Sequence, residues 1–226
     1  MFSQFTDPAF WLRLVIRLPV ILIALPVHEF AHGFVAHLCG DDTAKHNGRL
    51  TLNPMAHLDP IGTLCLIFAP IGWAKPVPVN PHNFRNPRSD DIKVSAAGPA
   101  SNFLLAVISL ILLKVIFQVF THLPAWLPAM LFISVFLNIG LGLFNLLPLF
   151  PLDGSHIVQN MLKWPASEKF AAFSRYAPLL LLAFVVMGGG RLLFLLVNFL
   201  AGNFISILMS DSEIHIIYIA LRNFGY

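Results

Sequence analysis

The chain has 226 residues, of which 57% are hydrophobic and only 11% are charged, and its mean hydropathy is +0.77. Soluble domains carry about 25% charged residues, so this composition excludes an ordinary soluble domain and predicts an integral membrane protein. The net charge of +3 is small, and no basic tract with interleaved aromatic residues is present, so nothing favours a nucleic-acid partner. We expect one membrane-embedded, all-α domain over residues 1–226, with about four to six spans of roughly 20 residues.

The first apolar segment, residues 12–38, contains His28-Glu29-Phe30-Ala31-His32 near its C-terminal end. Residues four apart share one face of a helix, so both imidazoles can reach a single metal ion. Glu29 lies one step round the helix, where it can take a proton from a metal-bound water. The alternative is a set of buried polar side chains that bridge helices. Three adjacent polar groups in an apolar helix are costly without a function, which favours the metal site.

A polar, turn-rich stretch with His46 and His57 separates this segment from the next apolar one. Either histidine can contact a substrate or stabilise an oxyanion, or simply be solvated. The apolar run that follows is too short to span a membrane. Residues 61–80 therefore predict a re-entrant segment or a short helix, followed by an edge strand that tolerates Pro76 and Pro78. Residues 81–93 predict a charged loop.

Two longer apolar segments, residues 96–120 and 126–150, are separated by a short connection and predict an antiparallel helical hairpin. The small residues of Gly98-Pro99-Ala100-Ser101-Asn102 predict close helix packing, and Asn102 needs a polar partner from a neighbouring helix or a substrate carbonyl. The last apolar block, residues 177–210, fits either two short spans or one broken span. These segments complete a three-helix core with additional C-terminal helices.

A catalytic zinc ion usually has three protein ligands and a water, and Asp153 is the candidate third ligand. It is the only acidic residue between Asp91 and Glu168, and it follows the third span on the membrane face predicted for the His-Glu-x-x-His motif. The alternative is an ordinary loop carboxylate outside the bilayer. His156 follows closely and is a candidate for supporting the ligands, or is merely interfacial.

Lysine and arginine are abundant in the loops at the motif's end of the spans, whereas the connection at residues 121–125 has none. The positive-inside rule therefore predicts a multi-pass protein of the cell membrane whose site opens towards the cytoplasm. Arg13, Arg17 and Lys114 lie near the opposite end and count against this orientation.

These motifs together resemble the site-2 protease family of intramembrane zinc metalloproteases, in a short form without a PDZ domain. The resemblance rests on the His28–His32 motif, on Gly98-Pro99-Ala100-Ser101-Asn102, and on Asn145-Leu146-Leu147-Pro148 leading to Leu152-Asp153-Gly154. The chain differs from longer members in having no span before the metal helix.

The resemblance implies one zinc ion bound by His28, His32 and Asp153, with Glu29 as the general base. Asn102, His57 and Asn145 would assist with the substrate or the oxyanion. The implied activity is regulated intramembrane proteolysis of transmembrane or membrane-proximal segments of protein substrates. The alternative is a non-catalytic metal-binding membrane protein for transport or sensing. A transporter needs polar groups along a whole transmembrane path, and here they gather at one face.

Overall fold

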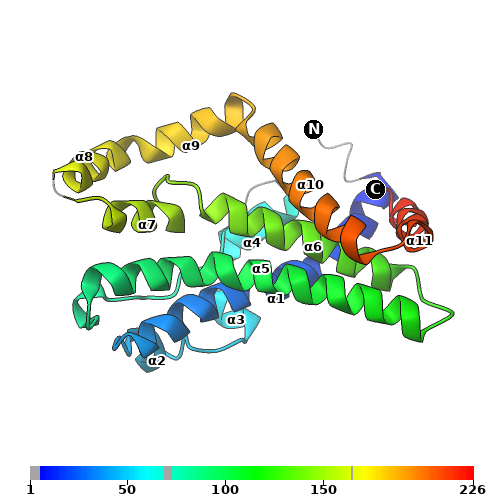
Figure 1. Cartoon of the computed structure of the whole chain (residues 1–226), viewed down its shortest axis with the longest axis horizontal. Helices are drawn as coiled ribbons and strands as arrows, with labels where there is room; N and C mark the ends of the chain where they lie inside the picture. Colours follow the sequence, from blue (N-terminus) through cyan, green and yellow to red (C-terminus); the bar gives the residue numbers. More distant parts are fainter. Residues whose placement is uncertain (1–5, 69–72, 164) are drawn as a thin grey trace.

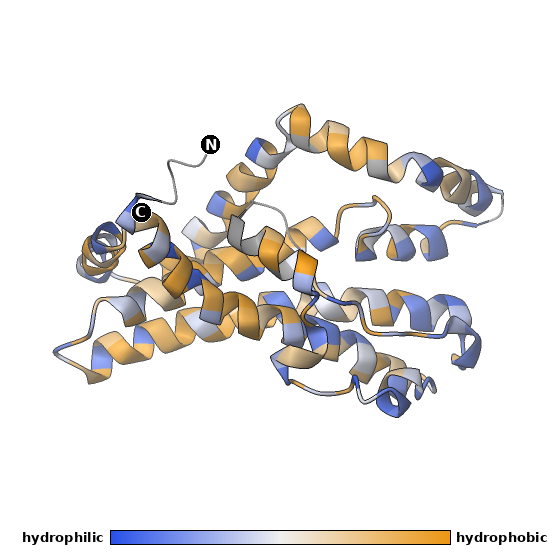
Figure 2. Ribbon diagram, turned by 180° about the vertical axis from the view of Figure 1, so that it is seen from behind, coloured by the Kyte–Doolittle hydropathy of each residue, from blue (hydrophilic) through white to orange (hydrophobic). Residues whose placement is uncertain are grey.

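The computed structural model describes residues 6–68, 73–163 and 165–226, and within these residues it forms helices and no strand. Four helices are long and apolar enough to cross a membrane: α1 (Pro8–Leu38), α5 (Pro87–Val119), α6 (Trp126–Asn145) and α10 (Gly189–Leu208). Between 17% and 39% of the most apolar window of each is buried inside the protein. The apolar side chains that stay exposed are left for lipid, and Figure 2 shows that hydrophobic residues are frequent along the long helices. The prediction of an all-α polytopic membrane protein is confirmed.

Shorter helices connect and flank these four. They are α2 (Thr43–His46), α3 (Pro54–His57), α4 (Pro60–Phe68), α7 (Asp153–Met161), α8 (Ala166–Phe173), α9 (Ala177–Val186), α11 (Asp211–Asn223) and the 3₁₀ turns η2 (Pro81–Asn83) and η3 (Ser174–Tyr176).

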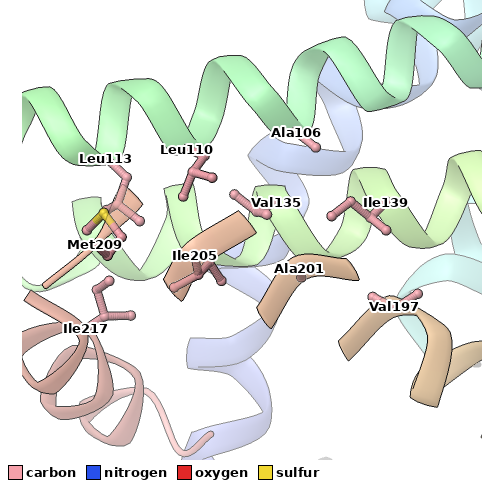
Figure 3. Close-up of a cluster of buried hydrophobic side chains, with 10 residues drawn as sticks. All are labelled: Ala106, Leu110, Leu113, Val135, Ile139, Val197, Ala201, Ile205, Met209 and Ile217. Atoms are coloured by element: carbon pink, nitrogen blue, oxygen red, sulfur yellow. The ribbon is translucent and has the colours of Figure 1, made fainter. Parts of the chain in front are cut away.

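The centre of the molecule is the pair α5 and α6, which lie side by side (Figure 1). Helix α1 packs against both, and α10 and α11 pack against α6. Apolar side chains from α5, α6, α10 and α11 meet in the main hydrophobic cluster, which includes Leu113, Val135, Ala201 and Ile217 (Figure 3). Lys114 also donates to both carboxylate oxygens of Glu213, at 3.0 and 2.9 Å, which ties α11 to α5.

Helix α5 begins nine residues before the predicted span at residue 96, so the prediction of a charged loop is wrong from Pro87 onward. Proline suits the first turn of a helix because its missing N–H has no helical partner there. The side chain of Asp90 accepts the Asn86 N–H at 2.8 Å, which satisfies a donor at this end. The helix therefore continues past the apolar segment. At the other end of the hairpin, α6 stops at Asn145 instead of residue 150, just before Pro148 and Pro151.

The predicted edge strand is replaced by an isolated antiparallel bridge between Leu58 and Ala74. The Lys75 N–H donates to the His57 carbonyl at 2.8 Å, and the chain then runs on without a further ladder. Pro76 and Pro78 have no N–H to donate, which explains why pairing stops. Helix α4 has nine residues and is too short to span, as predicted, while residues 69–72 of the predicted re-entrant segment lie outside the described residues.

The last apolar block is one broken segment. Helix α9 has 10 residues, α10 has 20, and Gly188 between them has a φ of 88°. Only α10 is long enough to span a bilayer. A left-handed φ is readily adopted by glycine and rarely by other residues, so Gly188 fixes the position of the break.

Candidate metal centre

His28 and His32 of α1 meet Asp153, the first residue of α7, in a compact cluster. Their nearest ligand atoms all lie within 4.8 Å of one another. The two imidazole Nε2 atoms are 3.0 Å apart, and each lies 3.4 Å from an oxygen of Asp153. The structure thus brings together the three residues predicted as ligands, although Asp153 is more than a hundred residues from the histidines.

The other nitrogen of each ring is already engaged. His28 Nδ1 lies 2.7 Å from the side-chain oxygen of Asn102, and His32 Nδ1 lies 2.7 Å from the backbone oxygen of Val94. An amide oxygen can only accept, so both Nδ1 atoms carry the proton and donate. In the neutral rings, both Nε2 lone pairs then face each other and Asp153. Such an arrangement is repulsive without a cation between these atoms.

Helix α5 passes these imidazoles at Gly98. A Cβ atom added there would lie 2.3 Å from His32 Nε2 and 2.5 Å from His28 Cε1. A residue with any side chain would therefore displace the two rings. The predicted close helix packing at this motif is confirmed. It is possible because Gly98 has no side chain where α5 passes the two imidazoles.

The donor set fits zinc. Two neutral imidazoles and one carboxylate are a common protein ligand set for catalytic zinc, which leaves one position for water or substrate. Within the described residues, Asp153 Oδ2 is buried without a hydrogen-bond partner. A buried carboxylate oxygen left in this state is costly, and a metal ion would satisfy it.

Glu29 is held by a segment far along the chain. Its Oε2 accepts the N–H of Val77 at 2.8 Å. Val77 stands between Pro76 and Pro78, so its N–H is the only backbone donor of that tripeptide. Arg49 donates to the carbonyls of Lys75 and Pro76, at 2.6 and 3.2 Å, and holds this extended segment next to the metal helix.

Of the remaining predicted site residues, Asn102 contacts a ligand directly, and the recorded hydrogen bonds of the others go elsewhere. Asn102 is fully buried, and its amide is shared between His28 and Asn138. His57, also fully buried, donates from Nε2 to the Thr51 carbonyl at 2.7 Å, while its Nδ1 has no hydrogen-bond partner within the described residues. Asn145 donates to Leu141 of its own helix. His46 is exposed.

Asp91 of α5 is a residue that sequence reasoning missed. Its carboxylate lies 3.6 Å from His156 Nδ1 and accepts from Asn160, so two residues of α7 are attached to α5 one turn apart. The hydrogen bond with Asp91 outweighs burial and raises the pKa of His156 above its usual value. This contact fixes the helix that begins with Asp153. No signal in the sequence pairs Asp91 with residues so far away.

Comparisons with known proteins agree with this geometry. The model of peptidase family M50 matches residues 115–187, which include Asp153. YwhC of Bacillus subtilis has been given the provisional name of a zinc metalloprotease. It is 40% identical to this chain over 183 residues, which cover 79% of this chain and 84% of YwhC. Rip2 of Mycolicibacterium smegmatis, with the same provisional description, is 37% identical over 139 residues, 59% of this chain and 52% of Rip2. The zinc metalloprotease MJ0392 of Methanocaldococcus jannaschii is 25% identical over 160 residues, which is 71% of this chain and 37% of MJ0392. No solved structure matches.

The chain therefore belongs to peptidase family M50, and its motifs relate it to the site-2 proteases. It is a zinc metalloprotease and a multi-pass membrane protein. The alternative of a metal-binding protein without enzymatic activity is set aside by this assignment.

Proposed function

We propose that this protein hydrolyses peptide bonds in transmembrane or membrane-proximal segments of other proteins, with one zinc ion held by His28, His32 and Asp153. The observation that supports this proposal is that two of the three ligands, and one wall of the cluster, belong to helices long and apolar enough to cross a membrane. Both histidines are in α1, and Gly98 of α5 forms one wall of the site. A substrate segment that reaches these residues must lie in or beside the bilayer.

Each residue has a defined task. The three ligands fix the ion, which when bound would polarise a scissile carbonyl and acidify a water. Glu29 takes the proton of the attacking water and passes it to the nitrogen of the leaving amine. Because Oε2 of Glu29 accepts from Val77, Oε1 is the oxygen available for the proton. A helical substrate must first unwind, since its carbonyls are otherwise hydrogen-bonded.

Glu29→Gln tests the assignment of the base. Glutamine has the same size and cannot accept the proton, so we expect unchanged zinc content and a cleavage rate lower by about 10²–10⁴-fold. The measurement is cleavage of single-span proteins co-reconstituted in lipid vesicles, together with zinc analysis of the same preparation. Glu168→Gln is the matched control, because Glu168 is exposed on α8, and it should cleave at the wild-type rate. Wild-type cleavage by Glu29→Gln would remove Glu29 from the mechanism.

A further inference from the structure

A chain of buried side-chain hydrogen bonds leads from His28 across α5 into α6. The Asn102 side chain contacts His28 Nδ1 at 2.7 Å and donates from Nδ2 to Asn138 Oδ1 at 3.0 Å. Asn138 in turn donates to the backbone oxygen of Ser134, at 2.9 Å. Asn102 and Asn138 are 0% and 1% exposed, so no water competes for these bonds. The chain links a predicted metal ligand on one helix to a backbone carbonyl on another.

The direction of every bond in this chain is fixed by its far end. The Ser134 carbonyl can only accept, so the amino group of Asn138 must face it, and the carbonyl of Asn138 must face Asn102. By the same reasoning, the amino group of Asn102 faces Asn138 and its carbonyl faces His28. His28 Nδ1 must then carry the proton, which leaves the Nε2 lone pair directed at the metal position.

The two histidines thus reach the same protonation state by different routes. His32 donates directly to a backbone carbonyl, that of Val94 on α5. Among the described residues, no backbone carbonyl bonds to His28 Nδ1, which reaches the carbonyl of Ser134 through two amides. Without Asn138, the amide of Asn102 is free to turn over and present its amino group to His28, which would favour the tautomer with the proton on Nε2.

We propose that Asn138 is a positioning residue for the zinc site, which sets the tautomer of His28 through Asn102. The proposal rests on the proposed role of His28 as a zinc ligand. Replacing groups that orient a metal-bound histidine typically lowers metal affinity by 10–100-fold. Asn138 acts through an intermediate, so we expect the lower end, about 10-fold, for Asn138→Leu.

A double-mutant comparison distinguishes this role from general stabilisation. Zinc affinity is measured by chelator competition for wild type, Asn138→Leu, Asn102→Ala and the double variant. If Asn138 acts only through Asn102, the double variant binds zinc as tightly as Asn102→Ala, within about twofold. If the two substitutions weakened zinc binding independently, their fold-losses of zinc affinity would instead multiply. The histidine tautomers of the metal-free proteins are read from ¹⁵N chemical shifts, and the His28 signal is identified by its loss in His28→Gln. We expect protonated Nδ1 in wild type and a mixture of tautomers in Asn138→Leu.

Two further variants serve as controls. Asn198 of α10, like Asn138, donates from its side chain to the carbonyl four residues before it, that of Phe194, at 2.7 Å, so Asn198→Leu should leave zinc affinity unchanged. Asn138→Asp should retain affinity within about threefold. A buried aspartic acid favours its neutral form, which can donate to Ser134 and accept from Asn102 in the same directions. This variant keeps the test decisive if Asn138→Leu does not fold.

The outcomes separate the two proposals. Wild-type protein that binds no zinc would overturn the proposed function itself. Wild-type protein that binds zinc, with Asn138→Leu binding it equally well and keeping the His28 tautomer, would overturn the role of Asn138 alone. An equal loss of affinity in Asn138→Asp and Asn138→Leu would also count against the proton-directing role, because the aspartic acid preserves the bond directions.

Discussion

Gly98 of α5 faces the two imidazoles, and it shows how a single missing side chain shapes the site. Gly98→Ala would place a Cβ 2.3 Å from His32 Nε2, so at least one ring must move. We expect zinc affinity to fall at least 10-fold, by analogy with other changes that misorient a ligand. Alanine is the better helix former by about 1 kcal/mol, so the helix itself is not weakened.

Gly202→Ala in α10 is the matched control for this prediction. A Cβ at Gly202 has no atom within 4 Å, so the change should leave zinc affinity as it is and leave stability equal or slightly higher. Both variants are compared by chelator competition and by thermal unfolding of the metal-free protein. Zinc binding by Gly98→Ala as tight as that of wild type would contradict this prediction, because it would mean that the two imidazoles can accommodate the added Cβ.

At the scale of single residues, the sequence identifies the residues of the metal centre better than it identifies the residues that contact them. The His-Glu-x-x-His spacing and the isolated Asp153 were enough to nominate three residues that the structure gathers into one cluster. The roles of Asn138 and Asp91 could not be foreseen, because each depends on the rotation of α6 or α7 against α5. A lone asparagine in an apolar span indicates a buried polar contact, not which helix supplies it.

The turn after α1 is attached to a distant segment by one buried carboxylate, that of Asp41. It accepts from the backbone and hydroxyl of Thr43, from the Asn80 N–H and from the Asn83 side chain. Asp41→Ala would leave these donors unsatisfied, and we expect a loss of about 2–4 kcal/mol in the free energy of unfolding. Asp42→Ala is the control, because the adjacent Asp42 contacts His37 and not the distant segment. If the free energy of unfolding fell no further in Asp41→Ala than in the control, Asp41 would not stabilise the contact between the turn after α1 and the distant segment.

The contribution of Asp41 should depend on pH in a defined direction. Burial opposes its ionisation, but hydrogen bonds from Thr43, Asn80 and Asn83 outweigh it and lower the pKa of the carboxyl below its usual value. A depressed pKa stabilises the fold above the unfolded value of about 3.9 and loses that effect as pH falls through the folded value. The difference between wild type and Asp41→Ala in denaturant unfolding should therefore shrink below about pH 4. A difference that grows in acid would contradict the assignment.

Helix α7 should be held more firmly at lower pH, for the opposite reason. The raised pKa of His156 means that its pair with Asp91 is complete below about pH 6.5 and is lost as pH rises through the folded value. In metal-free protein, hydrogen-exchange protection of α7 should be greater at about pH 6 than at about pH 8.5. Asp91→Asn should remove this difference while leaving the protection of α10 unchanged. Equal protection of α7 at both pH values in wild type would exclude the ion pair as its anchor.

Across the whole molecule, hydropathy located the spans, while features outside the apolar pattern set their ends. Helix α5 begins at Pro87, beyond the bilayer-sized segment, where the Asp90 side chain accepts the Asn86 N–H, and Gly188 divides the last block. The expected edge strand did not form because two prolines remove the donors that a ladder requires. Periodicity and composition therefore predict which segments lie in the membrane. Local backbone chemistry decides where each helix begins and stops.

The orientation of the molecule can be tested with two single cysteines, one in the connection between α5 and α6 and the other in α2, which follows α1. Loops beside the metal centre contain many lysines and arginines, and the connection between α5 and α6 has none, so the site should open to the cytoplasm. In a background without the native Cys39 and Cys65, Thr121→Cys and Lys45→Cys each place an exposed thiol. An impermeant maleimide should label Thr121→Cys in intact cells and Lys45→Cys only after the membrane is opened. A permeant maleimide should label both, which controls for reactivity. Labelling of Lys45→Cys alone in intact cells would place the metal centre on the outer side. It would mean that Arg13, Arg17 and Lys114 determine the topology.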